Sequence, residues 1–309
     1  MPHRLLHQRL HHQGREGKEL AGIAGMKDAG VVLLTDDGSP VGNPRVLRRA
    51  MEYARGFDLP FASHAETMEL SGNGAMNEGR ISYKLGIPGI PPESEEICID
   101  RDIRIARLAG ARLHIQHVTT YRGLLIIKRA KEDGCAVTCE VSPHHLIFNE
   151  EDITGYDANY KMNPPLRTKA DNEGLLQALI DGDFDIIATD HAPHSELEKA
   201  NDFASAPFGI TGLETALPSL YHHFIKPGVF GWDLVVRRYC VEPRKIIGVP
   251  PAEIKAGARA NFILFDPARQ TTFDREFTKS KSTNTPFFNR SLDGMVARVV
   301  LDDETLLAR

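Results

Sequence analysis

The chain has 309 residues, of which 41% are hydrophobic and 26% are charged, and its 37 basic and 42 acidic side chains give a formal net charge of −5. This is the composition of a globular protein with room for one α/β barrel or two smaller domains, without the dense basic runs that bind nucleic acid. No apolar run reaches the ~18 residues of a membrane span, and no apolar signal opens the chain, so we expect a cytoplasmic protein with neither membrane nor nucleic-acid partners.

From about residue 30 onward, short β-branched runs alternate with helical patterns, which is typical of a parallel sheet built from βαβ units. We expect strands over residues 31–35, 61–64, 113–117, 136–141 and 185–188. Helices are predicted between them, the first with Asn43 as its N-cap and another opening at Thr168 with Asp171 three residues later. Further on, residues 214–224 and 232–240 are predicted to be helical. Residues 262–265 and 296–300 are predicted to be strands of a separate small sheet.

Polar side chains follow each of the five predicted strands. They are Asp36-Asp37, His64, His117, the run Ser142-Pro143-His144-His145, and Thr189-Asp190-His191. Because a (βα)8 barrel builds its active site at the C-terminal ends of its strands, these side chains are expected to converge. Each signal has an ordinary alternative: Asp-Asp-Gly is a common turn, and His64 could be a hydrogen-bonded core histidine. His117 shares its strand with His114, and strand alternation lets at most one of them face the site.

Three loop segments are the other candidates. In IIATDHAPH, Asp190 could ligate a metal and move a proton, although a capped strand end with solvated histidines is the alternative. The loop 159–167, stiffened by two prolines, could present Asn163 to a substrate, and the loop at Phe208 and Gly209 could approach a ligand closely. Structural loops are the alternatives for both. The N-terminal histidines at positions 3, 7, 11 and 12 have no acidic or cysteine neighbour, and we set them aside as a metal site.

Nine segments, taken together, carry a family resemblance: TDDG, ASHAE, GIPGIPP, HIQHVTT, EVSPHHL, NYKMNPPLR, IATDHAPH, APFGITGLETALP and SKSTNTPF. In this order they resemble the bacterial-type (class I) dihydroorotases of the amidohydrolase superfamily, over roughly residues 17–300. The resemblance implies a metal-dependent (βα)8 TIM barrel beside a small β-sandwich. It also implies the reversible closure of N-carbamoyl-L-aspartate to L-dihydroorotate in pyrimidine biosynthesis.

The resemblance assigns roles position by position. Asp37 matches a carboxylate that bridges two metals, and His64 and His117 match the two histidines on the second zinc. Asp190 matches the ligand of the first zinc that also serves as general base and acid. The substrate-contacting positions are matched by Asn163, His194, Phe208 and Gly209.

One family feature has no counterpart, because the sequence contains no HxH pair, the motif that ends the first barrel strand of the family. We therefore expect an N-terminally truncated fold, with an atypical segment over residues 1–16, an incomplete barrel over 17–250 and the C-terminal part of the sandwich over 251–309. Two missing βα units would leave strand edges open, which predicts poor solubility alone or completion by another chain. The complete family site holds two zinc ions, and this chain is expected to hold one or none.

Three functions stay open at this point. The first is a dihydroorotase acting on carbamoyl aspartate or dihydroorotate, with the activity of this particular chain in question. The second is a non-catalytic dihydroorotase-like subunit that partners aspartate transcarbamoylase. The absence of the HxH pair favours this alternative. The third is a cyclic amidohydrolase of the hydantoinase or allantoinase type. The protein partners expected are a second copy of the chain or aspartate transcarbamoylase.

Overall fold

A six-stranded parallel sheet forms the centre of the computed structural model, which describes residues 8–10, 19–301 and 304–308. Its strands, in spatial order, are β1 (Gln8–Leu10), β2 (Leu33–Thr35), β3 (Phe61–Ser63), β6 (Leu113–Ile115), β7 (Val137–Val141) and β8 (Ile186–Ile187). Every neighbouring pair is parallel, so all the strand C-termini lie along one edge. The predicted α/β class and the five predicted strands are confirmed.

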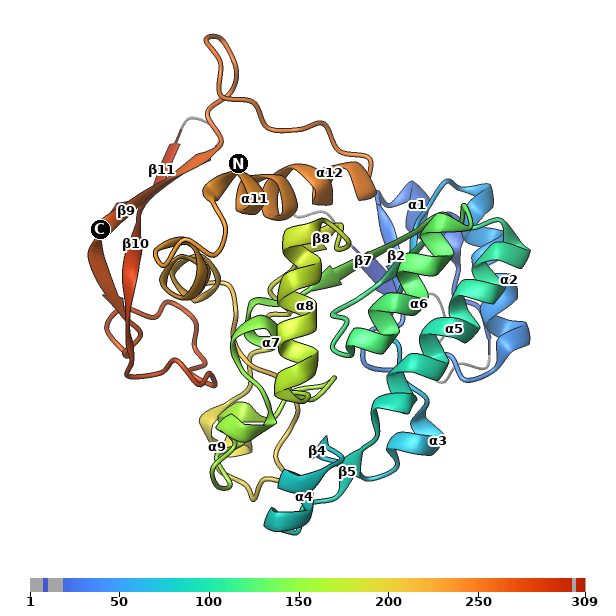
Figure 1. Ribbon diagram of the computed structural model, residues 1–309. Helices are drawn as coiled ribbons and strands as arrows, with labels where there is room; N and C mark the ends of the chain where they lie inside the picture. The colour runs from blue at the N-terminus through green and yellow to red at the C-terminus, as the bar shows by residue number, and fades with distance from the viewer. Residues whose placement is uncertain (1–7, 11–18, 302–303, 309) are drawn as a thin grey trace.

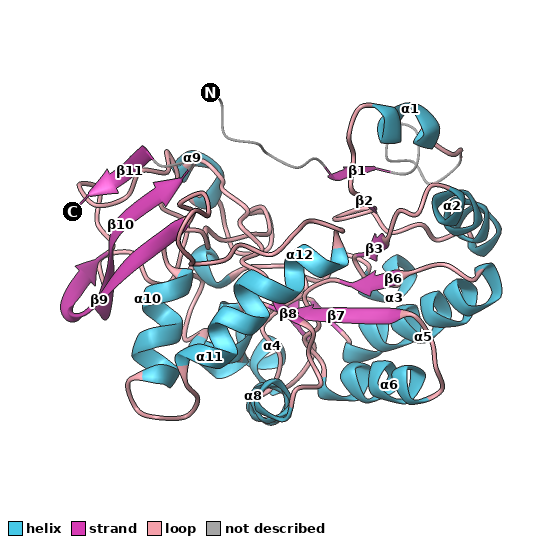
Figure 2. Cartoon of the chain, turned by 90° about the horizontal axis from the view of Figure 1, so that it is seen from above, coloured by secondary structure: helices cyan, strands magenta, loops and turns pink. Residues whose placement is uncertain are grey.

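Helices pack along the outside of this sheet (Figure 2). They are α1 (Ile23–Asp28), α2 (Pro44–Gly56), α5 (Pro92–Ala109), α6 (Tyr121–Glu132) and α8 (Lys169–Asp181). The predicted caps are present: the side chain of Asn43 accepts hydrogen bonds from the first turn of α2, and Thr168 accepts one from the backbone of Asp171. In α2, Leu47 and Met51 are fully buried against the sheet, and burial of such side chains stabilises a fold by about 1.5–3 kcal/mol each.

Short elements and loops follow the strand C-termini and extend to one end of the molecule (Figure 1). They are α3 (Met68–Ser71), β4 (Met76–Asn77), α4 (Arg80–Leu85), β5 (Gly89–Ile90), α7 (Pro143–Ile147), η2 (Glu150–Asp152), η3 (Ala158–Tyr160) and α9 (Glu196–Lys199). Their own apolar cluster, with Met76, Met162 and Phe203 fully buried, gives this loop layer a core separate from that of the sheet. The loops that carry the candidate site are therefore rigidly packed.

The C-terminal part differs in extent from the sequence prediction. Two helical rows are present, α10 (Ala216–Leu220) with η4 (Tyr221–Ile225), and α11 (Trp232–Val235) with η5 (Val236–Val241) and α12 (Glu242–Ile246). The antiparallel sheet of β9 (Phe262–Thr272), β10 (Ser291–Leu301) and β11 (Glu304–Ala308) is longer than predicted. The prediction ended at residue 265, before Pro267, but among the described strands β9 pairs with β10 alone, and an edge strand tolerates proline because one side needs no donor. The full β-sandwich stays a prediction.

The N-terminal segment also departs from the expectation. The sequence predicted no strand within residues 1–16, yet Gln8–Leu10 pairs in parallel with Leu33–Thr35. The rest of that segment, and with it the N-terminal histidines, lies outside the described residues. Among the described helices, none is both long and apolar enough to cross a membrane.

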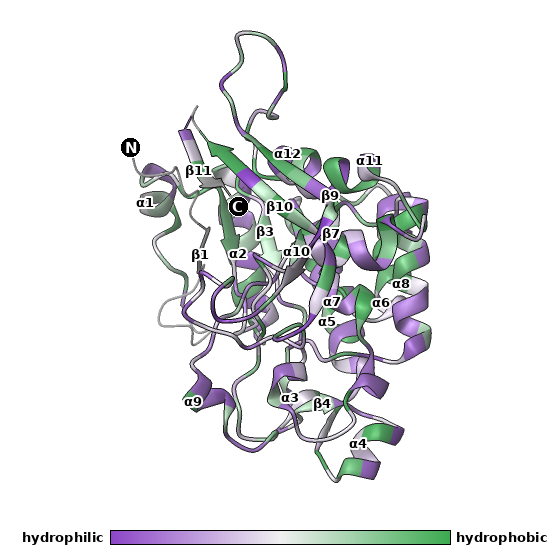
Figure 3. Cartoon of the chain, turned by 90° about the vertical axis from the view of Figure 1, so that its left-hand side faces the viewer, coloured by the Kyte–Doolittle hydropathy of each residue, from purple (hydrophilic) through white to green (hydrophobic). Residues whose placement is uncertain are grey.

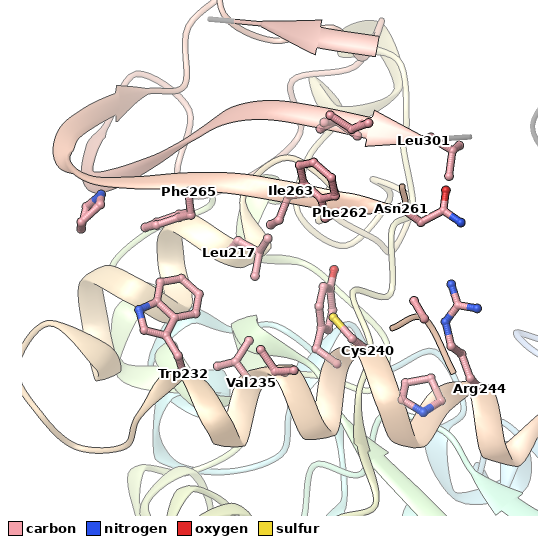
Figure 4. A pocket seen from close by; sticks show the side chains of 17 residues that line it. Leu217, Trp232, Val235, Cys240, Arg244, Asn261, Phe262, Ile263, Phe265 and Leu301 are labelled. Atoms are coloured by element: carbon pink, nitrogen blue, oxygen red, sulfur yellow. The ribbon is translucent and has the colours of Figure 1, made fainter. Parts of the chain in front are cut away.

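An apolar groove of about 750 Å³ lies between the helical row that starts at Trp232 and the inner side of β9 and β10 (Figure 4). Phe262 and Phe265 line it from the sheet, and Arg244 lies at one end. Figure 3 shows the hydrophobic residues along β9 and β10, interrupted by hydrophilic ones. None of the lining residues belongs to the predicted site, so this groove is a feature of the junction between the helical row and the C-terminal sheet.

Candidate metal centre

Three strand ends bring Asp37, His64 and His117 together. Asp37 follows β2, His64 follows β3 and His117 follows β6, and their ligand atoms lie within 4.8 Å of one another. His64 Nδ1 lies 3.0 Å from His117 Nε2 and 3.3 Å from Asp37 Oδ1. His117 Nε2 lies 3.6 Å from the same carboxylate oxygen. The structure thus assembles three of the four predicted metal ligands around one point.

The spacing of these three atoms suits a zinc ion. Zinc binds imidazole nitrogen and carboxylate oxygen at about 2.0–2.1 Å in tetrahedral geometry, which places two ligand atoms about 3.4 Å apart. The measured separations of 3.0, 3.3 and 3.6 Å bracket that value. Two imidazoles with one carboxylate, and room for a water or substrate atom, is also a donor set found in catalytic zinc sites.

Electrostatics of the cluster favour a bound cation. Burial alone would raise the pKa of Asp37, but hydrogen bonds from His117 and His64 outweigh it and hold that pKa below its usual range. Burial opposes a charged His64, but the carboxylates of Asp37 and Glu66 outweigh it and raise the pKa of His64 to about 10. The site therefore attracts positive charge, which a divalent ion supplies in place of protons.

Glu66 connects His64 to Asn163. Its carboxylate lies 3.1 Å from His64 Nε2 and accepts a hydrogen bond of 2.8 Å from Asn163 Nδ2, whose nitrogen lies 3.3 Å from the same imidazole. A carboxylate on the outer nitrogen of a histidine fixes its tautomer and leaves the inner nitrogen free to bind a metal. Asn163, predicted to contact substrate, is thereby held beside the metal ligands.

The two aspartates that follow β2 have different roles. Asp36 is fully buried and accepts backbone hydrogen bonds from His64, at 2.8 Å, and from Val41, at 3.3 Å. Burial raises the pKa of Asp36 to about 7, with a further contribution from Asp102. Asp36 therefore fixes the backbone at the end of β3, while Asp37 faces the site.

His114 and His117 lie in different environments, in agreement with the strand alternation. His114 Nε2 lies 2.9 Å from Glu140 Oε2, and its Nδ1 lies 2.8 Å from Thr138 Oγ1. The other oxygen of Glu140 accepts the backbone N–H of His117 at 3.3 Å. His114 and Glu140 therefore anchor the strand end from which the His117 ring enters the site.

Asp190 lies beside the cluster but is not one of its three members. Its carboxyl interacts electrostatically with His117 and Asp37, and burial raises its pKa against the opposing effect of His117. Both Asp190 and His117 adopt positive φ, 47° and 31° respectively. Such backbone strain is uncommon outside glycine and is concentrated at functional sites.

The remaining predicted substrate contacts form a second group. His194 Nε2 lies 2.7 Å from the carbonyl oxygen of Phe208, and the backbone N–H of Gly209 donates to the carbonyl of Lys161 at 3.0 Å. Lys161 lies two residues before Asn163, so this hydrogen bond joins the loop of Phe208 and Gly209 to the loop of Asn163. The Lys161 ammonium also lies 4.3 Å from the centre of the Phe208 ring.

Three other histidines lie near the strand ends, and hydrogen bonds connect two of them to the surrounding scaffold. His145 lies 2.7 Å from Ser142 Oγ and 2.9 Å from the carbonyl oxygen of Pro164, and it is buried. His191 Nδ1 accepts the backbone N–H of Gly212 at 3.1 Å. His144 is buried, and its Nε2 has no hydrogen-bond partner among the described residues. None of the three joins the metal cluster.

Comparison with known proteins places this geometry in a family. Residues 9–122 match the family described as Dihydro-orotase-like. The chain is 41% identical to the dihydroorotase of Caldanaerobacter subterraneus subsp. tengcongensis over 292 residues, which cover 94% of this chain and 68% of the relative. It is 43% identical to the dihydroorotase of Carboxydothermus hydrogenoformans over 91% of this chain and 66% of the relative. The chain belongs to the dihydroorotase family. It spans about two thirds of the length of these relatives.

Solved structures show the same fold at lower identity. The L-hydantoinase (dihydropyrimidinase) from Arthrobacter aurescens matches with a TM-score of 0.80 and 22% identity, covering 97% of this chain and 69% of that one. The dihydropyrimidinase from Brevibacillus agri matches with a TM-score of 0.78 and 23% identity, covering 92% and 65%. At this identity the likeness shows the fold alone and does not indicate a substrate.

Two residues at this dihydroorotase-family site were missed from the sequence. Glu66 stands two residues after His64, and that spacing, which places side chains on one face of an extended segment, could have indicated it. Asn284 touches the loop of His194 and Gly209 although it lies 75 to 92 residues further along the chain. No local pattern marks such a contact.

Proposed function

We propose that this chain catalyses the reversible cyclisation of N-carbamoyl-L-aspartate to L-dihydroorotate. The observation that carries the proposal is the cluster of Asp37, His64 and His117 at three parallel strand ends, in a chain 41–43% identical to dihydroorotases. The chemistry of this donor set fits zinc, and a bound zinc ion supplies Lewis acidity toward a carbonyl oxygen and activates water near neutral pH.

Asp190 is proposed as the group that moves the proton. In the hydrolytic direction its carboxylate accepts a proton from the attacking water and returns it to the ring nitrogen as the ring amide bond breaks. In the direction of ring closure the same carboxyl takes the proton from the attacking nitrogen and gives it to the oxygen that leaves as water. A carboxyl whose pKa is raised by burial is suited to both halves of this exchange.

The proposed substrate contacts come from two sides of the metal cluster. Asn163 lies 3.3 Å from the outer nitrogen of His64, so its amide is placed to orient a polar substrate group next to the ion. On the other side, the proposed contacts are His194, Phe208 and Gly209, joined to the Asn163 loop through Lys161. Positioning of this kind raises the reaction rate, because the reacting groups are already held in the orientation that the reaction needs.

Zinc content and turnover, measured together, test the proposal. We expect the purified chain to bind zinc and to interconvert dihydroorotate and N-carbamoyl-L-aspartate. Asp190→Asn should keep zinc bound and reduce turnover by about 10²-fold or more, the usual size of general acid–base catalysis. Hydantoin serves as the alternative substrate. Faster turnover of hydantoin than of dihydroorotate would indicate a hydantoinase-type enzyme instead.

A non-catalytic subunit is the second candidate, favoured by the absence of an HxH pair from the 309 residues. Such a subunit would turn over neither substrate, whether or not zinc is bound at Asp37, His64 and His117. Co-purification with aspartate transcarbamoylase would then distinguish it from an inactive enzyme. A chain that binds no zinc and turns over neither substrate would contradict the enzyme and favour the subunit.

A further inference from the structure

The segment SKSTNTPF, between β9 and β10, reaches the candidate site through Asn284. This side chain is only 4% exposed, and all its hydrogen-bonding groups are used. Its Oδ1 accepts the backbone N–H of His194 at 3.1 Å, and its Nδ2 donates to the carbonyls of Ala192 and Gly209, both at 3.0 Å. The backbone carbonyl of Asn284 accepts the N–H of Thr211 at 2.9 Å.

These hydrogen bonds join two loops with different origins. One loop runs from Asp190 to His194 after β8, and the other runs from Phe208 to Thr211. The two loops also touch directly, since Ala192 N–H donates to the carbonyl of Ile210 at 2.8 Å. Asn284 lies across both of them and fixes their separation.

A primary amide satisfies all the groups around this side chain. One neighbour is a backbone N–H, which needs an acceptor, and two are backbone carbonyls, which need donors. An aspartate would face the carbonyls of Ala192 and Gly209 with a charged oxygen and leave both without a donor. An alanine would remove all three hydrogen bonds.

The spacing that Asn284 fixes is tight at Gly209. This residue has φ of +126°, and a Cβ added to it would lie 2.6 Å from Ala192 Cβ and 3.2 Å from His194 Nε2. The loops therefore fit only at one separation. His194 and Phe208, the proposed substrate contacts, are set by that separation through their own contact of 2.7 Å.

We propose that Asn284 is a positioning residue that holds His194 and the Phe208–Gly209 loop in the geometry that binds substrate. The inference rests on the proposed function, because it concerns how substrate is held rather than which ion is bound. The Asn284 side chain holds the backbone of Ala192, His194 and Gly209, which are not members of the metal cluster, so its loss should weaken substrate binding and leave that cluster intact.

The test compares Asn284→Asp with Asn289→Asp, an exposed asparagine two residues after the SKSTNTPF segment whose substitution makes the same change of charge. Binding of N-carbamoyl-L-aspartate to the zinc-loaded chain is measured by calorimetry, and KM and kcat are measured wherever turnover is present. We expect Asn284→Asp to raise Kd and KM about tenfold or more, since small displacements of binding groups have large effects, with kcat and zinc content little changed. The control should bind as the wild type does.

Hydrogen–deuterium exchange locates the effect. Peptides covering 190–194 and 207–211 should exchange faster in Asn284→Asp and remain unchanged in Asn289→Asp. If Asn284→Asp fails to fold, Asn284→Ala removes the same three hydrogen bonds without placing a charge at this buried position, and weakened binding with normal zinc content supports the inference.

Two results would overturn it: wild-type substrate affinity in a folded Asn284→Asp or Asn284→Ala variant, or loss of zinc from either variant without a change in substrate affinity. A wild-type chain that binds zinc but no N-carbamoyl-L-aspartate is a different failure. It contradicts the proposed function, and unchanged exchange in both peptides would then contradict the positioning role as well.

Discussion

Two residues of the candidate site adopt a backbone conformation that few side chains accept. His117 and Asp190 have φ of 31° and 47°, and a left-handed conformation costs a non-glycine residue roughly 1–3 kcal/mol. Such strain persists only where contacts with neighbouring residues hold the backbone in that conformation. At His117 the backbone N–H is held by Glu140, which His114 holds in turn. The strand end thus directs the imidazole into the cluster at the expense of local stability.

The contact between Glu66 and His64 predicts an effect on metal affinity. Glu66→Gln removes the charge that favours a proton on the outer nitrogen of His64, so the inner nitrogen is offered to the metal less often. We expect the affinity for zinc or cobalt to fall by about 10- to 100-fold, the range typical of such partners. Competition with a chelating dye measures it. Glu69→Gln, an exposed neighbour, is the control, and equal affinities in both variants would refute the role of Glu66.

His145 predicts how stability depends on pH. Burial lowers the pKa of His145 to about 3, against an ordinary value of 6.5, so the folded state holds the neutral ring. Between those two values the unfolded chain binds a proton that the folded chain does not, so stability is present above pH 6.5 and is lost as pH falls toward 3.

Urea unfolding at several pH values checks this, with His145→Gln as the variant that cannot take up the proton. We expect the wild type to be the more stable at pH 7 by about 1–2 kcal/mol, from the hydrogen bonds of His145 to Ser142 and Pro164. The difference should shrink steadily below pH 6.5. A difference that is constant from pH 7.5 to pH 4.5 would contradict the buried neutral imidazole.

At the level of elements, the sequence predicted the features that depend on residues close together in the chain. Alternation of β-branched runs and capped helices predicted the five strands β2, β3, β6, β7 and β8, and strand ends indicated Asp37, His64 and His117. Properties that depend on neighbours in space were not predictable. Pro267 is tolerated because β9 is an edge strand, and the pairing of Gln8–Leu10 is a contact with Leu33–Thr35 that no local pattern shows. Asn284 was missed for the same reason.

Lys131 of α6 contacts the residues just before β8, the strand that leads to Asp190, and we expect this contact to stabilise the fold. Its ammonium donates to Asp185 Oδ2 at 2.6 Å and to the carbonyl of Asp183 at 2.7 Å. The same Asp185 oxygen accepts the N–H of Cys139 in β7, so the lysine ties α6 to the start of β8. Lys131→Met should lower the free energy of unfolding by about 1–3 kcal/mol, because it leaves partly buried acceptors unpaired.

The control for Lys131 is Lys128, on the same helix, which donates to Asp183 Oδ2 at 2.9 Å and is the more exposed of the two, with 44% of its side chain exposed against 26% for Lys131. Exposed ion pairs contribute little to stability, so Lys128→Met should cost clearly less than Lys131→Met. Urea denaturation followed by circular dichroism measures both variants. Equal losses would mean that charge, and not the connection to β8, stabilises this part of the sheet.

At the scale of the whole molecule, the C-terminal sheet packs against the helices through aromatic side chains. Phe265 of β9 lies 5.1 Å from Tyr221 and 4.9 Å from Trp232, measured between ring centres. Gly294, at a bulge of β10, passes directly over this cluster. Together with the apolar groove beside it, the cluster is one of the places where the C-terminal sheet is held to the helices that cover β8.

A substitution at Gly294 therefore tests how firmly the C-terminal sheet is joined to the helices. It has φ of +85°, and an added Cβ would lie 2.3 Å from the Phe265 ring and 2.6 Å from the Tyr221 ring. Gly294→Ala should push β10 away from the helices and lower the free energy of unfolding by roughly 1–3 kcal/mol from overpacking, in addition to the backbone strain. Faster proteolysis of β9 to β11, at unchanged zinc affinity, would locate the damage at this junction.

Gly257→Ala separates the two causes, since Gly257 has φ of +81° but an added Cβ would have nothing within 4 Å. Both variants carry the strain of a left-handed alanine, and only Gly294→Ala carries the steric contact. We expect the difference between their unfolding free energies to measure the steric cost at the contact between the C-terminal sheet and the helices. Equal losses would show that the aromatic cluster yields to the added methyl group. The C-terminal sheet would then be held to the helices by contacts other than Phe265 and Tyr221.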